Sequence, residues 1–212
     1  MEQRDHWESI YRSSPDRFGT SPSRVGKVAL DAFTDHDVKT VLELGCGQGR
    51  DTLQFLEAGM QVIGLDYSPT CLDQLRERTS TSDLDHLIHL RECDLREGIP
   101  LPDDSVDGCF SHMFFTMHLR EEELSRIFGE VLRVLRPGAM NIYSVRNVND
   151  PHFREGTHVE EDMWEMNGFV VHYFSSEKVE RLASGYEIVG LEEFEEGPLP
   201  KRLYKVVLRK PL

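Results

Sequence analysis

The chain has 212 residues, and its 24 Lys plus Arg against 38 Asp plus Glu give a formal net charge of −14 at pH 7. This length suits one domain that buries its own core. The acidic balance argues against a nucleic-acid partner, because affinity for nucleic acid comes mostly from Lys and Arg that neutralise phosphates. With hydrophobic residues at 39% and charged residues at 29%, the composition is that of a folded protein rather than a disordered one.

Neither a membrane span nor an export signal is visible. The longest run without a formal charge, residues 108–119, is 12 residues long, whereas a helix that spans a bilayer needs about 20. Residues 1–20 are rich in charge and contain no apolar signal-peptide core. The four cysteines stand singly, without CxxC spacing. We therefore expect a cytoplasmic protein with reduced thiols and no membrane partner.

Short apolar runs alternate with amphipathic stretches in the first part of the chain, which predicts strand–helix units around a parallel sheet. Ser68 and Pro69 favour a helix start, because Ser caps the first turn and Pro at the first helical position loses no hydrogen bond. The predicted elements are helices at 4–11 and 22–33, a strand at 40–44, a glycine cluster at 45–49, a helix at 50–58, a strand at 61–66 and a helix from 69.

The second part continues this alternation and then changes. Apolar residues at helical spacing over 124–135 predict a helix that Pro137-Gly138 ends. Residues 147–166 are polar and lack periodicity, which predicts an irregular segment. The remaining predicted elements are strands at 87–91, 106–111 and 139–145, a helix at 176–184 and an antiparallel hairpin of strands 187–194 and 202–209. The expected fold is α/β and doubly wound: a mostly parallel seven-stranded sheet with one antiparallel strand and helices on both faces.

The glycine cluster and an acid after the second strand indicate a site for an adenosine-containing ligand. Gly45, Gly47 and Gly49 follow the first strand, and Asp66 comes nineteen residues after Gly47. Glycines let the backbone approach the ligand, and the acid accepts hydrogen bonds from ribose hydroxyls. A dinucleotide site has GxGxxG spacing, whereas this turn reads GxGxG. Glu43 would repel a pyrophosphate but suits a ligand that carries an ammonium and a sulfonium.

At these residues the chain resembles the class I, seven-stranded and Rossmann-like, S-adenosylmethionine-dependent methyltransferases. Four segments carry the resemblance in the family's order and spacing, namely 41–49, 62–66, 93–95 and 132–138. Residues 47–51 more weakly resemble the tellurite-resistance and thiopurine branches, whose substrates are small molecules. Ala139 departs from the family where many members have a second glycine.

The resemblance implies S-adenosylmethionine as cofactor, S-adenosylhomocysteine as product, and a set of binding residues. Gly45 and Gly47 would contact the methionine part, and Ser111 would line that end. Asp66 would hold the ribose, Tyr67 would lie against the adenine and Asp94 would accept its amino group. The alternative for both acids is a helix-cap or turn role. The expected cofactor-binding set is Tyr11, Glu43, Gly45, Gly47, Gly49, Asp66, Tyr67, Asp94, Leu95 and Ser111.

Methyl transfer from a sulfonium depends mainly on positioning, and a general base is needed only when the acceptor arrives protonated. His112, His118 and His152 follow carboxyl ends of strands, where ligands bind in open α/β sheets, and are the candidate catalytic residues. The alternative for His118 is a partly buried residue near a helix start. His152, His158 and His172 are too loosely spaced to predict a metal site.

Trp7 and Tyr11 share a helix face, and in the resembling families N-terminal helices fold over the cofactor and substrate. The alternative is ordinary packing of that helix. We expect one methyltransferase domain over 1–212, with a helical lid at 1–35, a cofactor-binding core at 38–146, and a substrate-side segment with the C-terminal hairpin at 147–212.

The sequence thus predicts an S-adenosylmethionine-dependent methyltransferase that acts on a small molecule. The substrate is expected to be neutral or cationic, because the net charge disfavours anions at long range. Alternatives are a protein methyltransferase, a non-catalytic regulatory protein that binds the cofactor, and a nicotinamide dehydrogenase. The motifs of nucleic-acid methylation, Asn/Asp-Pro-Pro-aromatic and Pro-Cys, do not occur. Oligomeric state and acceptor atom stay open.

Overall fold

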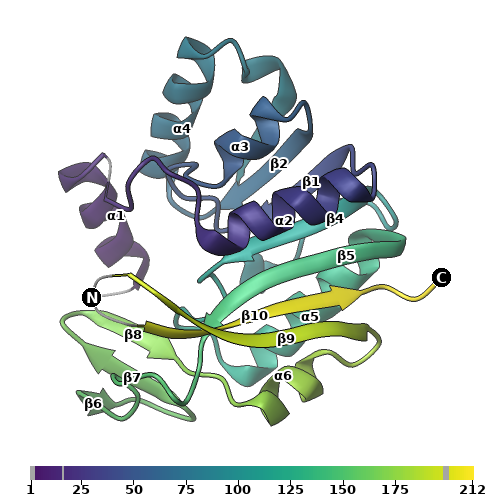
Figure 1. Cartoon of the computed structure of the whole chain (residues 1–212). Helices are drawn as coiled ribbons and strands as arrows, with labels where there is room; N and C mark the ends of the chain where they lie inside the picture. The colour runs from purple at the N-terminus through teal and green to yellow at the C-terminus, as the bar shows by residue number, and fades with distance from the viewer. Residues whose placement is uncertain (1–2, 16, 198–200) are drawn as a thin grey trace.

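A seven-stranded sheet forms the centre of the protein (Figure 1). The computed structural model describes residues 3–15, 17–197 and 201–212. The strand order is β3-β2-β1-β4-β5-β10-β9, and β10 runs antiparallel to both of its neighbours. The pairs among β1 to β5 are parallel. This topology confirms the predicted sheet. Its strands are β1 Thr40–Leu44, β2 Gln61–Asp66, β3 Ile88–Glu92, β4 Val106–His112, β5 Leu135–Arg146, β9 Glu187–Glu196 and β10 Lys201–Arg209.

Helices cover both faces of the sheet. One face packs against α2 and α3 through Phe33 and Phe55, which are fully buried. The other face packs against α5 and α6, and the apolar stripe of α5 that the sequence showed is buried there. The helices are α1 Gln3–Ser13, α2 Arg24–Asp35, α3 Thr52–Glu57, α4 Pro69–Thr81, α5 Glu121–Val134 and α6 Ser176–Leu182, with short 3-10 turns η1 Asp85–Leu87 and η2 Leu95–Glu97. No helix of the described ranges is long and apolar enough to cross a membrane.

A second, three-stranded antiparallel sheet lies below α1 in Figure 1, partly in the segment predicted to be irregular. Its strands are β6 Thr157–His158, β7 Met163–Met166 and β8 Phe169–His172. They have two to four residues each, too few to show a period of two. A signal was nonetheless present, because Asn167-Gly168 joins β7 to β8 with positive φ at both residues, and Asn-Gly is the preferred pair in such turns.

The end of α5 also differs from the prediction. The helix stops at Val134, and Leu135 already has extended backbone angles. Pro137 and Gly138 therefore lie inside β5 rather than at the helix end. The β4–β5 register shifts between Val106 and Gly108 opposite this segment. Gly138 has φ +81°, a conformation that Gly adopts without strain.

His172 and Lys178 link the small sheet to α6 and α5. His172 is fully buried. Its Nδ1 lies 2.7 Å from the Leu119 carbonyl, and its Nε2 lies 2.7 Å from Nζ of Lys178. Lys178 also donates to Asp162 at 2.8 Å. Burial, followed by the Lys178 charge, lowers the pKa of His172 from 6.5 to about 4.

We expect His172 to make the folded protein less stable as the pH falls below about 6.5. Between its folded and unfolded pKa values the unfolded chain binds more protons, so acid favours unfolding. From about pH 7.5 to about pH 5.5 this effect amounts to about 1.4 kcal/mol of unfolding free energy. Urea unfolding at both pH values should show that His172→Gln lacks this component, whereas the exposed-site variant His89→Gln keeps it. An equal pH response in His172→Gln and the parent would contradict the assignment.

Candidate active site

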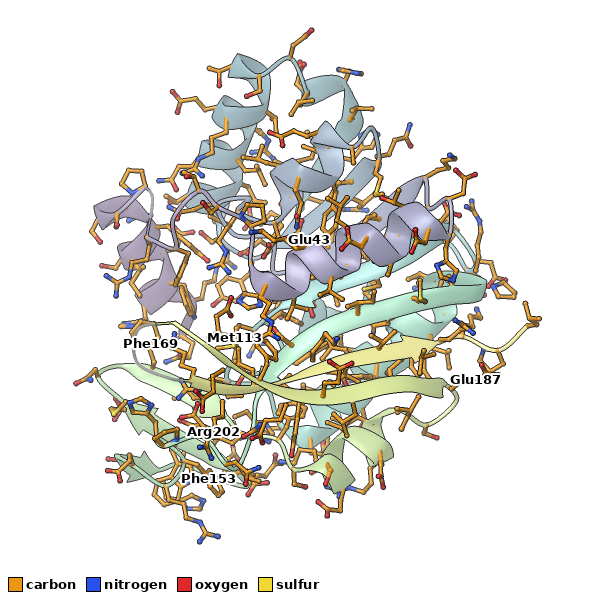
Figure 2. All side chains as sticks on the ribbon, viewed as in Figure 1. Glu43, Met113, Phe153, Phe169, Glu187 and Arg202 are labelled. Atoms are coloured by element: carbon orange, nitrogen blue, oxygen red, sulfur yellow. The ribbon has the colours of Figure 1, made fainter. Side chains whose placement is uncertain are left out.

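A cavity of about 1150 Å³ opens at the carboxyl ends of β1, β2 and β4, between the sheet, α1 and the small sheet. Loops that follow parallel strands meet at this edge, so residues distant in sequence converge there. Figure 2 labels Glu43, Met113 and Phe169, which all line the cavity; the last two lie on the side that α1 occupies. The predicted site residues that line it are Tyr11, Glu43, Gly45, Gly47, Asp66, Tyr67, Asp94, Leu95, His112 and His118.

The glycine turn brings the backbone close to aromatic rings. Gly45 and Gly47 have φ values of +65° and +52°. A Cβ at Gly45 would lie 2.8 Å from Cδ2 of Phe114, and one at Gly47 would lie 3.2 Å from the Tyr11 hydroxyl. Any side chain at these two positions would therefore fill space at the cavity wall.

Asp66 fixes this turn. Its Oδ2 accepts a hydrogen bond from the Gly47 amide at 3.0 Å, and its Oδ1 accepts one from the Ser68 amide at 3.0 Å. Burial raises the pKa of the carboxyl group. Each carboxylate oxygen can accept a second hydrogen bond, so Asp66 can hold the turn and still accept bonds from a ligand hydroxyl.

Glu43 adds a second buried carboxyl group. Its Oε2 accepts a hydrogen bond from the Thr52 hydroxyl at 2.6 Å. Burial, with Asp51 and Asp66 nearby, raises the pKa of Glu43 well above its usual range. All three acids line the cavity, and they favour positive charge in a ligand at this end.

Asp94 caps a turn and also lies at the cavity. It caps η2 by accepting a hydrogen bond from the Arg96 amide at 3.0 Å. The Arg96 guanidinium also binds the carboxylate, at 2.6 Å for the shortest contact, and lowers the pKa of Asp94. Asp94 nevertheless lines the cavity together with Tyr67 and Leu95.

Three predicted residues do not line the cavity. Gly49 turns toward α4, where a Cβ would lie 2.2 Å from Cδ1 of Leu75, so it serves packing. Ser111 is fully buried in β4; side chains alternate along a strand, and the next residue, His112, faces the cavity instead. His152 lies 3.2 Å from Asp150 and 3.1 Å from Arg146, in a polar cluster beside the cavity.

The two remaining candidate histidines differ in environment. Nδ1 of His112 lies 2.8 Å from the Ser144 hydroxyl, and its Nε2 lies 3.3 Å from Glu196. Burial, followed by the charges of Arg50 and Lys201, lowers the pKa of His112 to about 3, so the ring is neutral at physiological pH. His118 is 39% exposed, and its Nε2 lies 4.0 Å from Glu160.

The histidines considered as metal ligands are engaged elsewhere. Nε2 of His158 lies 2.9 Å from the Glu161 carbonyl, and both ring nitrogens of His172 have the partners described above. Within the described part of the chain, one group has metal-ligand spacing, Asp83, Asp85 and His86. It is exposed, follows the end of α4 and does not line the cavity.

Part of the N-terminal region that was predicted to form a lid lines the cavity. Trp7 and Tyr11 of α1 line the cavity, with ring centroids 5.7 Å apart, and Trp7 lies 5.4 Å from the Phe169 ring of β8. By contrast, α2 packs Val25 and Phe33 into the core. Arg17, Phe18 and Gly19, which follow α1, also line the cavity. The part of residues 1–35 that covers the cavity thus lies before α2, and its action as a lid stays a prediction.

Sequence reasoning missed several residues of the cavity wall. Phe114 and Met117 fall in the uncharged run 108–119, whose length could have drawn attention to them. Arg50 follows the glycine turn directly. Arg146 and Lys201 come together because β5 and β10 pair, and no local pattern marks them.

Comparisons with known proteins agree with this geometry. Residues 41–138 match the family described as "Methyltransferase domain". Malonyl-[acyl-carrier protein] O-methyltransferase of Serratia marcescens is 32% identical over 57% of this chain and 43% of its own length. The chain thus spans less than half the length of this curated relative.

Two solved structures share the fold over nearly the whole chain. The 1,6-didemethyltoxoflavin-N1-methyltransferase of Burkholderia thailandensis, solved with S-adenosylhomocysteine, has a TM-score of 0.75 at 18% identity and covers 99% of this chain and 88% of its own. TehB from Haemophilus influenzae has a TM-score of 0.71 at 19% identity, with 96% and 67% covered. With the motifs in order along the matched segment, residues 41–138 are a methyltransferase domain of the class I, S-adenosylmethionine-dependent family.

Proposed function

We propose that the protein is an S-adenosylmethionine-dependent methyltransferase that acts on a small molecule in the cytoplasm. The observation that carries the proposal is the cavity in which Asp66 braces the glycine turn beside Glu43 and Asp94. Glycines whose Cβ atoms would fill the wall, and carboxyl groups that favour an ammonium and a sulfonium, fit this cofactor. The described cysteines are free thiols, which supports the proposed compartment.

The residues of the chain would bind the cofactor and exclude water. Asp66 would accept hydrogen bonds from the ribose, Tyr67 and Leu95 would enclose the adenine with Asp94 on its amino group, and Gly45 and Gly47 would contact the methionine part. When bound, the cofactor supplies the electrophilic methyl group. Trp7 and Tyr11 cover this end of the cavity, so α1 would keep water from the reacting atoms.

His112 and His118 would act differently at the substrate side. Because both His112 nitrogens have partners and its pKa is low, we assign it to orienting Ser144 and Glu196 rather than to proton abstraction. His118 lines the cavity and is partly exposed, so it is the candidate base for an acceptor that arrives protonated.

The cavity also bears on the rival functions. Its volume of about 1150 Å³ exceeds the roughly 300–1,000 Å³ of usual ligand sites, which favours a cofactor with an acceptor beside it over cofactor binding alone. A protein methyltransferase needs access for a polypeptide, and α1 bridges the opening between α4 and β8. These features support a small-molecule acceptor.

We expect S-adenosylhomocysteine to raise the melting temperature and NAD to leave it unchanged. A ligand at about 100 times its dissociation constant stabilises a protein by about 2.7 kcal/mol. Differential scanning fluorimetry with both ligands, followed by an assay for S-adenosylhomocysteine release with a panel of small acceptors, tests the proposal. Stabilisation by NAD alone would contradict the cofactor. Binding without turnover on any acceptor would favour the regulatory alternative.

A further inference from the structure

The end of the cavity formed by β5 and β10 gathers cations from three parts of the chain. Arg50 follows β1, Arg146 ends β5 and Lys201 begins β10, and all three line the cavity. The acids Glu43, Asp51 and Asp66 lie on β1, the start of α3 and β2. The cavity therefore has acids concentrated toward the proposed cofactor and a cationic cluster toward the acceptor.

The cations of this cluster are only partly neutralised. Asp150 holds Arg146 through two hydrogen bonds, one of them 2.7 Å from Nε. Arg50 lies 3.5 Å from Glu196 and donates to the Phe18 carbonyl at 3.3 Å. Its Nε has no hydrogen-bond partner but lies 4.0 Å from Asp51 in an ion pair. The Lys201 side chain makes no hydrogen bond or ion pair within residues 3–15, 17–197 and 201–212. Arg50 and Arg146 thus have carboxylate partners, namely Asp51 and Glu196 for Arg50 and Asp150 for Arg146, whereas Lys201 has none among the described residues.

Burial and the neighbouring cations both lower the pKa values of two groups in the cluster. Partial burial, followed by the Arg146 charge, lowers the pKa of Lys201. The pKa of His112 falls to about 3 through burial and then through Arg50 and Lys201. Glu196 and Asp150 act on Lys201 in the opposite direction, but the net shift is downward. An anion bound here would stabilise the charged form of Lys201.

The walls beside the cluster are aromatic. Tyr173 lies over the Arg146 guanidinium, with 5.3 Å from the ring centroid to Cζ. Trp164, Phe169 and Phe114 line the same cavity. A flat apolar body could contact these rings while a charged group reaches the cluster.

We propose that the methyl acceptor is an aromatic or apolar molecule with a carboxylate, which Lys201 and Arg50 bind. This replaces the expectation of a neutral or cationic substrate, because the net charge of −14 averages over the surface while a cavity responds to the groups that line it. The inference rests on the proposed function for the acceptor's role, although the carboxylate site itself can be tested separately.

Three indoles of equal ring size and different charge test the proposal. Indole-3-acetate, indole-3-acetamide and tryptamine are titrated calorimetrically into the full chain, with and without saturating S-adenosylhomocysteine. We expect the acid to bind at least about tenfold more tightly than the amide or the amine, as a charge-assisted hydrogen bond allows. Equal or tighter binding of the amide or amine, or no binding of the acid, overturns the proposal.

Variants of Lys201 test whether this side chain binds the carboxylate. Lys201→Met should weaken binding of the acid about tenfold, and Lys201→Glu should shift the preference to tryptamine. Lys27→Met is the matched control, because it removes the same charge from an exposed site on α2 and should change nothing. Unchanged acid binding in Lys201→Met would contradict the site. The affinity for S-adenosylhomocysteine is also measured in each variant. If S-adenosylhomocysteine does not bind, the proposed function is contradicted, whereas the carboxylate titration still tests the carboxylate site.

Discussion

Deletion of residues 1–20 is expected to reduce methyl transfer by roughly 100-fold or more, because displaced catalytic geometry has effects of that size. Helix α1 is held at its start and at its middle. Glu8 accepts a hydrogen bond from the Thr70 hydroxyl of α4 at 2.5 Å, and Gln3 donates to the Gly168 carbonyl beside β8 at 2.9 Å. Without α1 the cavity loses Trp7 and Tyr11 and opens to water, which weakens electrostatic interactions in the site.

The central domain should remain folded after this deletion. Helix α2 starts beyond it, and the Ser23 amide keeps its 2.7 Å hydrogen bond to Asp51. Urea unfolding and circular dichroism check the fold, calorimetry with S-adenosylhomocysteine checks cofactor binding, which should weaken but persist, and product release reports turnover. Trp7→Ala should show the same pattern more weakly, with the exposed-site variant Ser9→Ala as control. Full turnover by the truncated protein would show that α1 is not a lid.

Asp66→Ala is expected to lower the affinity for S-adenosylhomocysteine by about 2–4 kcal/mol, because hydrogen bonds to a charged group contribute about 1.5–3 kcal/mol each. This corresponds to a rise in the dissociation constant of about 30- to 1000-fold. The loss would combine missing ribose contacts with release of the Gly47 and Ser68 amides that the carboxylate now holds.

The control for this experiment is a variant of an exposed acid that is close to Asp66 in the chain. Asp73→Ala removes a carboxylate from α4 whose side chain is 73% exposed and pairs with Arg76. Its affinity for S-adenosylhomocysteine should match the parent within error. Calorimetric titration of both variants at one salt concentration measures the difference. A dissociation constant for Asp66→Ala equal to that of Asp73→Ala would remove Asp66 from the cofactor site.

Most of the fold could be predicted from local sequence patterns. The apolar stripe of α5 has the period of a helix. The buried strands β1 and β2 are short apolar runs bounded by turn residues, which is typical of strands in a parallel sheet. Ser68 does cap α4, accepting a hydrogen bond from the Cys71 amide. Errors arose where local preference and pairing disagreed. Pro137-Gly138 reads as a helix end, yet these residues lie in β5 because the pairing with β4 extends to Leu135.

Most residues of the predicted cofactor-binding set line one cavity, and the sequence could predict that they converge because they follow strand ends in a fixed order. Gly47 and Asp66 are far apart in the chain, but adjacent parallel strands bring their ends together. The sequence could not predict which side chains of a strand face the cavity. Whether His112 or Ser111 faces the cavity depends on which face of β4 is turned toward it, and one residue of register reverses the answer.

The sequence by itself determined the sheet and the positions of the glycine turn and the acid that follow its first two strands. It also determined the cofactor class that these residues favour. Only the tertiary structure brought together the cations of the proposed acceptor side, since Arg50, Arg146 and Lys201 meet through the pairing of β5 with β10 and the turn after β1. The physical reason is that the two kinds of effect act over different distances along the chain. Backbone periodicity and turn chemistry act over a few residues and are written locally, whereas the potential inside a cavity sums charges from segments that approach only after folding.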